Sequence, residues 1–235
     1  MLIKPKLDRK KMPKHIAISV SGHKDWAEEN KESIENVYKY VFENVKEIIE
    51  LQIKYNTPLV TLYLLTNKVS KSEYFSEIID KLVEFFDLLV HNNSIHENKI
   101  KVSILGKWYN LPGRVIDSIK RVIDETKDYD HYFLNLCINY DGKEELVDSC
   151  KLIARRVVNG KLDVDSIDED AIKENLYSSY FLPPDLIIKT GYNRKIGGFL
   201  LWDSTSALIH FTDIPWIDYD EEEFIKSLKY YQDYK

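Results

Sequence analysis

The sequence predicts a single α/β domain in which a mostly parallel sheet is flanked by helices. Short apolar segments of strand length alternate along the chain with longer stretches whose apolar residues recur at helical spacing. The short segments are mostly apolar and do not alternate strictly with polar residues, as in strands that are buried on both faces. The length of 235 residues, 44% of them hydrophobic, suits one large domain with a packed core.

Five apolar segments are predicted as strands. Each is short and bounded by Gly, Pro or polar turn residues, which interrupt regular structure. In chain order they are 15–20, 59–65, 100–105, 132–138 and 185–189. Two more apolar segments, 199–202 and 208–211, follow the fifth strand.

The stretches between these strands are predicted as helices because their apolar residues recur every three or four positions. In chain order they span 26–55, 72–90, 112–123, 142–158, 168–177 and an acidic segment from about 219. The chain shows neither a repeat nor a linker. We therefore expect a basic arm at 1–14 and one domain at 15–235.

Composition excludes several classes of protein. No apolar run approaches the ~20 residues that a membrane-spanning helix needs, and the chain start lacks the apolar stretch of a signal peptide. Cys137 and Cys150 are too few for a disulfide scaffold, so we expect two buried thiols in a reducing compartment. A net charge of −6 disfavours a nucleic-acid surface. We expect a cytoplasmic protein that binds no nucleic acid.

The N-terminal arm is basic, with lysines at 4, 6, 10, 11 and 14 and an arginine at 9. Such an arm is either a solvated tail or a contact for anionic lipid or a phosphorylated ligand. The second interpretation would place the protein at a membrane surface.

Ligands of open α/β sheets usually bind beyond the carboxyl ends of the strands. The segments in that place are 21–25, 66–71, 139–143 and 189–198. The last of them holds Lys189, Arg194 and Lys195 among small residues. Lysine charge and accessible backbone N–H groups suit a phosphate, although loop lysines are more often simply solvated.

Specific motifs occupy these strand ends. Residues 184–191 read PDLIIKTG, 198–202 read GFLLW and 211–213 read FTD. Residues 15–18 read HIAI, and Gly22 and Trp26-Ala27 follow at fixed spacing. In this order they resemble the cis-prenyltransferase family of undecaprenyl and dehydrodolichyl diphosphate synthases, whose pattern reads PDLIIRTGGExRxSNFLLWQ with FTD downstream.

The resemblance implies a parallel six-stranded sheet with surrounding helices. Family enzymes add isopentenyl diphosphate to an allylic diphosphate, with Mg²⁺ assisting departure of the diphosphate. The product grows in a hydrophobic tunnel, whose walls would correspond here to the helices near 32–55 and 72–90. From the residues themselves, those apolar faces are better interpreted as core.

The chain departs from the family at its metal-binding positions. Ser21 replaces the Asp of the first motif, His23 replaces an Asn, and Asp25 replaces the Arg that precedes Trp26. Leu208 replaces the metal-binding Glu near the C-terminus. Mg²⁺ is held by hard anionic oxygens, so the usual metal site is not expected in this chain.

Some diphosphate-binding positions keep their charge. Lys189 and Lys195 replace two family arginines, and Lys71 falls near a third. Arg194 lies beside Lys195 in the same loop. Lysine lacks the two-pronged guanidinium geometry, so weaker diphosphate binding is expected.

These departures predict a catalytically impaired subunit that partners an active cis-prenyltransferase or itself forms a dimer. The Lys189-Thr190-Gly191 sequence and Gly198 before Phe199 are similar to the family's non-catalytic partners. Such partners in eukaryotes end in Arg-x-Gly, whereas this chain ends YYQDYK. No cofactor is expected for this chain alone; Mg²⁺ would belong to the active partner.

Two alternatives remain open. The first is a stand-alone prenyltransferase with a shifted Mg²⁺ site formed by Asp25 and Asp203. The second is a protein that binds prenyl diphosphates without turnover and without a partner. Both keep isopentenyl and allylic diphosphates as ligands.

Overall fold

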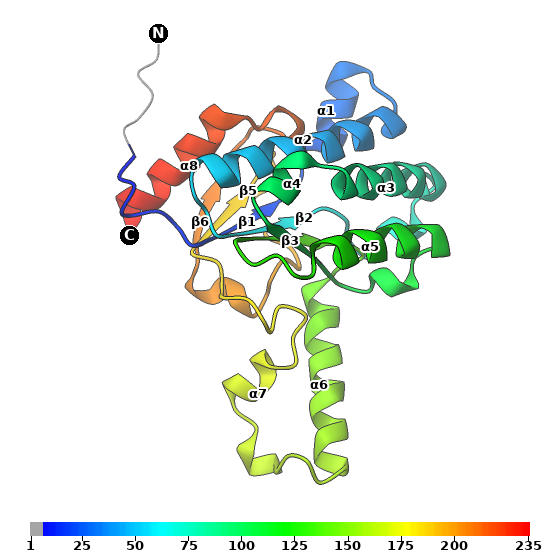
Figure 1. Cartoon of the computed structure of the whole chain (residues 1–235), viewed down its shortest axis with the longest axis vertical. Helices are drawn as coiled ribbons and strands as arrows, with labels where there is room; N and C mark the ends of the chain where they lie inside the picture. Colours follow the sequence, from blue (N-terminus) through cyan, green and yellow to red (C-terminus); the bar gives the residue numbers. More distant parts are fainter. Residues whose placement is uncertain (1–6) are drawn as a thin grey trace.

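A six-stranded sheet, parallel throughout, forms the centre of the molecule (Figure 1). The computed structural model describes residues 7–235, apart from the side chains of residues 34 and 35. The strands lie in the order β3-β4-β2-β1-β5-β6, which confirms the predicted fold class and the six-stranded sheet. They are β1 (His15–Ser19), β2 (Leu59–Tyr63), β3 (Ile100–Leu105), β4 (Tyr132–Cys137), β5 (Leu186–Lys189) and β6 (Leu208–Phe211).

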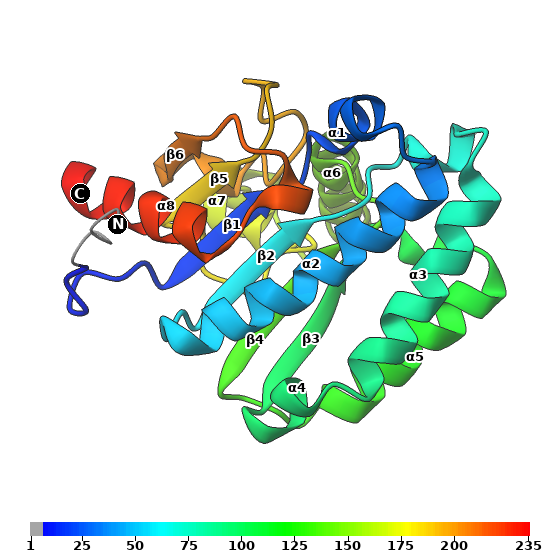
Figure 2. The same cartoon turned by 90° about the horizontal axis from the view of Figure 1, so that it is seen from above.

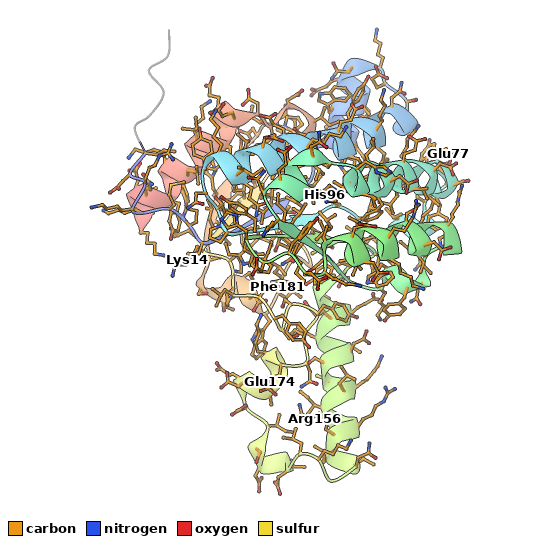
Figure 3. The ribbon with its side chains drawn as sticks, viewed as in Figure 1. Lys14, Glu77, His96, Arg156, Glu174 and Phe181 are labelled. Carbon is orange, nitrogen blue, oxygen red and sulfur yellow. The ribbon has the colours of Figure 1, made fainter. Side chains whose placement is uncertain are left out.

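Helices cover the two faces of the sheet unequally (Figures 1 and 2). On one face lie α2, α3, α5 and α8, with α1 beside the start of α2; on the other lie α6 and α7. The α6–α7 pair extends away from the body, and Arg156 of α6 faces Glu174 at the end of α7 across 3.7 Å (Figure 3). The helices are α1 (His23–Asn30), α2 (Ile34–Lys54), α3 (Phe75–Val90), α4 (Asn93–Glu97), α5 (Gly113–Thr126), α6 (Gly142–Val158), α7 (Glu169–Lys173) and α8 (Glu221–Tyr234).

Most of the hydrophobic core lies on the face that carries four helices. Strand residues there pack against the apolar sides of the helices, whose burial removes nonpolar surface from water. The rings of Phe42 in α2 and Phe85 in α3 stack at 4.9 Å, so these two helices are in direct contact. The opposite face has a smaller cluster that includes Ala17, Tyr63, Cys137, Ile187, Phe199 and Leu200.

Three sequence expectations need correction. The segment 26–55 contains two helices, because Lys31 adopts a left-handed conformation and Ser33 caps a new helix. The helix expected at 168–177 covers only Glu169–Lys173. Cys137 is buried as expected, but Cys150 is exposed on α6.

The predicted N-terminal arm is described from residue 7 onward, and its first six residues lie outside the described part. Within residues 7–235, no helix is both long and apolar enough to cross a membrane.

Candidate functional site

The order of the strands singles out one place on the sheet. The strands β1 and β5 are neighbours in the sheet. The chain continues from β1 to β2 on one side and from β5 to β6 on the other, so the connections diverge between β1 and β5. Ligands in open α/β sheets bind at the carboxyl ends of the strands where the direction changes. Here Ser21 and Gly22 follow β1, and Lys189 ends β5 opposite Ser19.

The two loops at this point touch through glycines. Gly22 has φ 86° and caps α1, and Gly191 has φ 76°; this left-handed region favours glycine. A Cβ added to Gly191 would lie 2.7 Å from the Cα of Gly22. The loops can therefore approach this closely only without side chains, and this approach places Ser21 beside the end of β5.

Lys189 and Ser21 are hydrogen-bonded at the centre of this edge. The Lys189 ammonium donates to Ser21 Oγ at 2.6 Å, and Ser21 Oγ donates to the carbonyl oxygen of Thr190 at 2.5 Å. Thr190 Oγ1 accepts the Ser21 N–H at 3.0 Å. Lys189 is only 5% exposed, and this burial lowers its pKa to about 8. The described residues provide no carboxylate ion pair for this ammonium group.

His23 starts α1 next to this pair. Its Nδ1 is buried and has no hydrogen-bond partner among the described residues, and its ring lies 5.5 Å from that of Tyr38. Burial, followed by the positive charges of Lys24 and Lys189, lowers the pKa of His23 to about 4. The imidazole is therefore neutral near pH 7.

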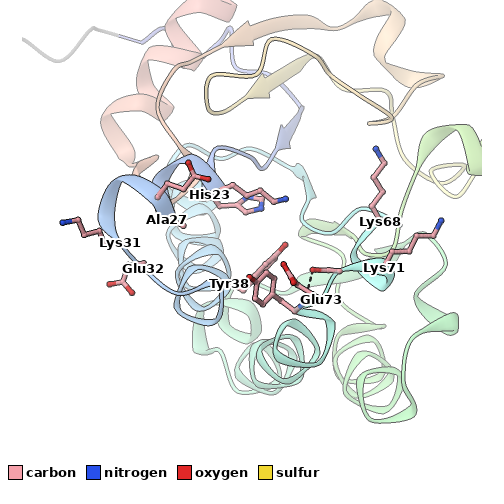
Figure 4. Close-up of a pocket in the computed structure, with 12 residues that line it drawn as sticks. His23, Ala27, Lys31, Glu32, Tyr38, Lys68, Lys71 and Glu73 are labelled. Carbon is pink, nitrogen blue, oxygen red and sulfur yellow. Dashed lines mark hydrogen bonds between the residues drawn. The ribbon is translucent and has the colours of Figure 1, made fainter.

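A cavity of about 790 Å³ opens beside His23, between α1, the start of α2 and the segment that leads into α3 (Figure 4). His23 and Lys24 lie on the α1 side, and Lys68 and Lys71 come from the facing segment. The cavity is thus bordered by cations from two elements. Its complete lining is His23, Lys24, Ala27, Glu28, Lys31, Glu32, Tyr38, Lys68, Lys71, Ser72, Glu73 and Tyr74.

The four cations predicted to bind diphosphate have different surroundings. Lys71 lines the cavity, and Lys189 lies close enough to His23 to lower its pKa. Arg194 forms an ion pair with Asp213 and lies over the ring of Phe211. Lys195 is exposed in the same loop. Of the four, only Lys71 borders the described cavity.

Trp26, a first-motif position, has a structural contact. Its Nε1 donates to Asp218 at 3.1 Å, and its ring packs edge-on against Tyr40 of α2. These contacts join α1 to α2 and to the segment before α8. They hold the helix that carries His23 and Lys24.

The structure does not bring together Asp25 and Asp203, the two carboxylates of the alternative metal site. Asp25 is exposed on α1, above the sheet. Asp203 is 4% exposed on the other face, where it accepts hydrogen bonds from Lys173 of α7 at 2.7 Å and from Ser178 at 2.6 Å. The sheet separates the two carboxylates. Across residues 7–235, no group of three or more His, Cys, Asp or Glu side chains is arranged to hold a metal ion.

The sequence interpretation missed part of the cavity. Lys24 lies on α1, but Lys31 lies just beyond its end in a left-handed conformation, so no helical spacing linked the two lysines. Tyr38 carried no signal either, because it belongs to the regular apolar pattern of α2.

Comparison with known proteins shows the same likeness over nearly the whole chain. Residues 20–235 match the family model described as "Putative undecaprenyl diphosphate synthase". The chain is 30% identical to the tritrans,polycis-undecaprenyl-diphosphate synthase (geranylgeranyl-diphosphate specific) of Thermoplasma volcanium, covering 94% of this chain and 86% of that protein. The protein of the same name from Methanocaldococcus jannaschii is also 30% identical, covering 98% and 84%.

Two solved structures share the fold. Lavandulyl diphosphate synthase from Lavandula x intermedia, in complex with dimethylallyl diphosphate, superposes with a TM-score of 0.87 at 23% identity, covering 95% of this chain and 96% of that one. A probable undecaprenyl diphosphate synthase from Campylobacter jejuni has a TM-score of 0.75 at 21% identity, covering 98% and 97%. The resemblance found in the sequence motifs is confirmed.

Proposed function

The chain belongs to the undecaprenyl diphosphate synthase family, the cis-prenyltransferases. Because Ser21, Asp25 and Leu208 depart from the family pattern, we propose that it binds prenyl diphosphates as the non-catalytic subunit of a heteromeric synthase. Its ligands are isopentenyl diphosphate and an allylic diphosphate, the pair that family enzymes join. Its partner under this proposal is a catalytic homologue. Pairing with a second copy of this chain is the other assembly to test.

The hydrogen bond between Lys189 and Ser21 carries this proposal. Ser21 stands where the family has a carboxylate, and its hydroxyl group is already engaged with Lys189 and Thr190. A buried ammonium group attracts phosphate oxygens and repels a divalent cation. The edge of the sheet is therefore suited to hold a diphosphate and unsuited to hold a metal ion.

The residues at the usual metal positions do not fit Mg²⁺. This ion is bound through carboxylates and phosphates in near-octahedral geometry. Ser21 is committed to Lys189, and Leu208 on β6 has no donor atom in its side chain. We therefore assign no metal-assisted step to this chain.

The cavity supports the allylic part of the proposal. Lys24, Lys68 and Lys71 provide positive charge at its border, while Ala27 and Tyr38 provide apolar surface. A diphosphate with an isoprenoid tail needs both kinds of surface. His23 also lines this cavity and contributes a neutral imidazole to its border.

A stand-alone prenyltransferase is the second candidate, and the names of the relatives favour it. The Thermoplasma volcanium and Methanocaldococcus jannaschii proteins are both named as synthases, and each aligns with more than nine-tenths of this chain. Substitution of the carboxylates that line the cavity tests this second candidate. These residues are Glu28, Glu32 and Glu73.

Calorimetric titration with isopentenyl diphosphate tests the binding step at Lys189. We expect the same affinity with Mg²⁺ and with a chelator, and a loss on the order of tenfold or more in Lys189→Ala, because one charge-assisted contact disappears. Lys120→Ala, which changes an exposed lysine of α5, is the matched control. Binding that requires Mg²⁺ would contradict the proposed site.

Size-exclusion chromatography with a catalytic homologue from the same source tests the partner. A shared peak of higher mass supports the heteromeric subunit. The chain could instead bind farnesyl diphosphate but form a complex neither with the homologue nor with a second copy of itself. That result would favour the alternative of a protein that binds prenyl diphosphates without a partner.

A further inference from the structure

The described part of the N-terminal arm, residues 7–14, is fastened to α8. The Gln232 amide donates to the carbonyl oxygens of Asp8 at 2.8 Å and Lys11 at 3.1 Å, and its Oε1 accepts the Asp8 N–H at 3.0 Å. Leu7 and Met12 pack against the hydrophobic core. From residue 7 onward the arm therefore has a defined path, and its basic side chains have defined places.

The arm and the end of α8 enclose a cavity of about 440 Å³, here called the basic hollow. It lies at the amino end of β1, whereas the candidate functional site lies at the carboxyl end of that strand (Figure 2). The two sites are therefore separate. The basic hollow is lined by Lys10, Lys11, Met12, Lys14, Asp185, Tyr231, Gln232 and Lys235.

The acidic residue of this lining, Asp185, is already engaged. Its Oδ2 accepts the backbone N–H groups of Lys14 at 2.7 Å and His15 at 3.1 Å. Its Oδ1 lies 3.3 Å from the Lys235 ammonium group. Asp185 thus fixes the start of β1 and pairs with one of the four lysines, and its charge is offset by these donors.

The ammonium groups of Lys10, Lys11 and Lys14 form no ion pair among the described residues. All three side chains are exposed around the basic hollow. The nearby carboxylate of Asp8 accepts the backbone N–H of Lys10. Acidic residues outnumber basic ones in this chain, yet three unpaired lysines gather here. Their mutual repulsion is relieved by a ligand that carries several negative charges.

We propose that the basic hollow binds a phosphate group. A phosphate group offers one negative charge in a phosphodiester headgroup, or two or more in a phosphomonoester or diphosphate, and several acceptor oxygens to lysines that converge from one loop and one helix end. The group is supplied either by an anionic lipid headgroup at a membrane surface or by a soluble phosphorylated compound. The inference goes beyond the proposed function, because it depends neither on Lys189 nor on a partner subunit.

The test compares two charge-matched triple variants. Lys10→Gln, Lys11→Gln and Lys14→Gln together remove the unpaired charges of the basic hollow. Lys46→Gln, Lys120→Gln and Lys161→Gln remove three exposed charges elsewhere. The fold is expected to survive in the first variant, because the lysine side chains are exposed and Gln232 holds the arm through backbone atoms. Thermal melting of both variants checks this.

Co-sedimentation measures binding to vesicles of phosphatidylcholine with and without phosphatidylglycerol. Calorimetry measures binding of pyrophosphate in a Lys189→Ala background, which removes the buried cation of the candidate functional site. We expect the full chain to bind one of these probes. Affinity should fall roughly fivefold per lysine, on the order of 100-fold for the hollow variant, and stay near the parent value for the control.

The variant Gln232→Ala tests whether binding depends on the position of the lysines as well as on their charge. It removes the hydrogen bonds from Gln232 to Asp8, Lys11 and Met12 and no lysine, so binding should weaken while net charge stays the same. Binding to phosphatidylglycerol vesicles without pyrophosphate binding assigns a lipid headgroup, and pyrophosphate binding assigns a soluble ligand. The inference is overturned if the full chain binds neither probe, or if the control variant loses as much affinity as the hollow variant.

Discussion

Lys189 provides the charge on which diphosphate binding at the candidate site depends. Burial lowers its pKa to about 8, while a bound diphosphate stabilises the ammonium form and raises that pKa. Affinity for isopentenyl diphosphate should therefore decrease as pH rises through about 8, by up to about tenfold per pH unit. Calorimetric titrations across this range measure it. Lys189→Arg stays charged, so its profile should be flat, and an unchanged decrease in that variant would exclude Lys189 as the titrating group.

Lys173 neutralises the buried carboxylate of Asp203. Lys173→Met leaves Asp203 without its cation and should lower the free energy of unfolding by about 3 kcal/mol at pH 7. Urea denaturation at pH 7 measures this loss. Lys151→Met breaks a more exposed ion pair with Asp148 and should lower the free energy of unfolding by less than about 1 kcal/mol. An equal loss in the two variants would contradict a special contribution of the buried Lys173–Asp203 pair to stability.

At the scale of elements, the contact between the β1 and β5 loops depends on Gly191. Gly191→Ala combines positive-φ strain with a Cβ against the backbone of Gly22. Gly160→Ala has positive φ but open space, so it isolates the strain, about 1 kcal/mol. Thermal unfolding should show a larger loss for Gly191→Ala, which should also weaken farnesyl diphosphate binding. Equal losses of stability in the two variants would mean that the close approach of the two loops contributes nothing to stability.

Strands were predictable because their apolar character does not depend on partners, whereas helix ends depend on single residues. Lys31 and Ser33 break the segment 26–55, and the Ser33 side chain accepts the N–H of Asn36. The segment 199–202 is apolar because Phe199 and Leu200 are buried, but it adopts turns, with Leu200 at φ 44°. Burial alone therefore does not distinguish a strand from a buried turn.

The candidate site was predictable where strand ends determine it. Ser21 and Lys189 meet because parallel neighbours end at the same edge of the sheet. Asp203 could not be placed, because its partner Lys173 comes from α7, and no local pattern links the two. The same holds for the basic hollow, where Gln232 joins residues more than two hundred positions apart.

At the scale of the whole molecule, positive charge gathers at both ends of β1 although the chain is acidic. Lys189 and the cavity lysines lie beyond its carboxyl end, and the basic hollow lies at its amino end. One rigid sheet thus separates two places suited to phosphate. We expect the two to bind independently, so Lys189→Ala should leave vesicle binding unchanged.

Incorporation of labelled isopentenyl diphosphate, with farnesyl diphosphate and Mg²⁺, tests the central claim most directly. The chain is assayed alone, with a catalytic homologue from the same source, and the homologue is assayed alone. We predict no condensation by this chain alone, and more product from the mixture than from the homologue by itself. Lys189→Ala should reduce that gain. Robust Mg²⁺-dependent condensation by the purified chain alone would contradict the non-catalytic role and establish a stand-alone prenyltransferase.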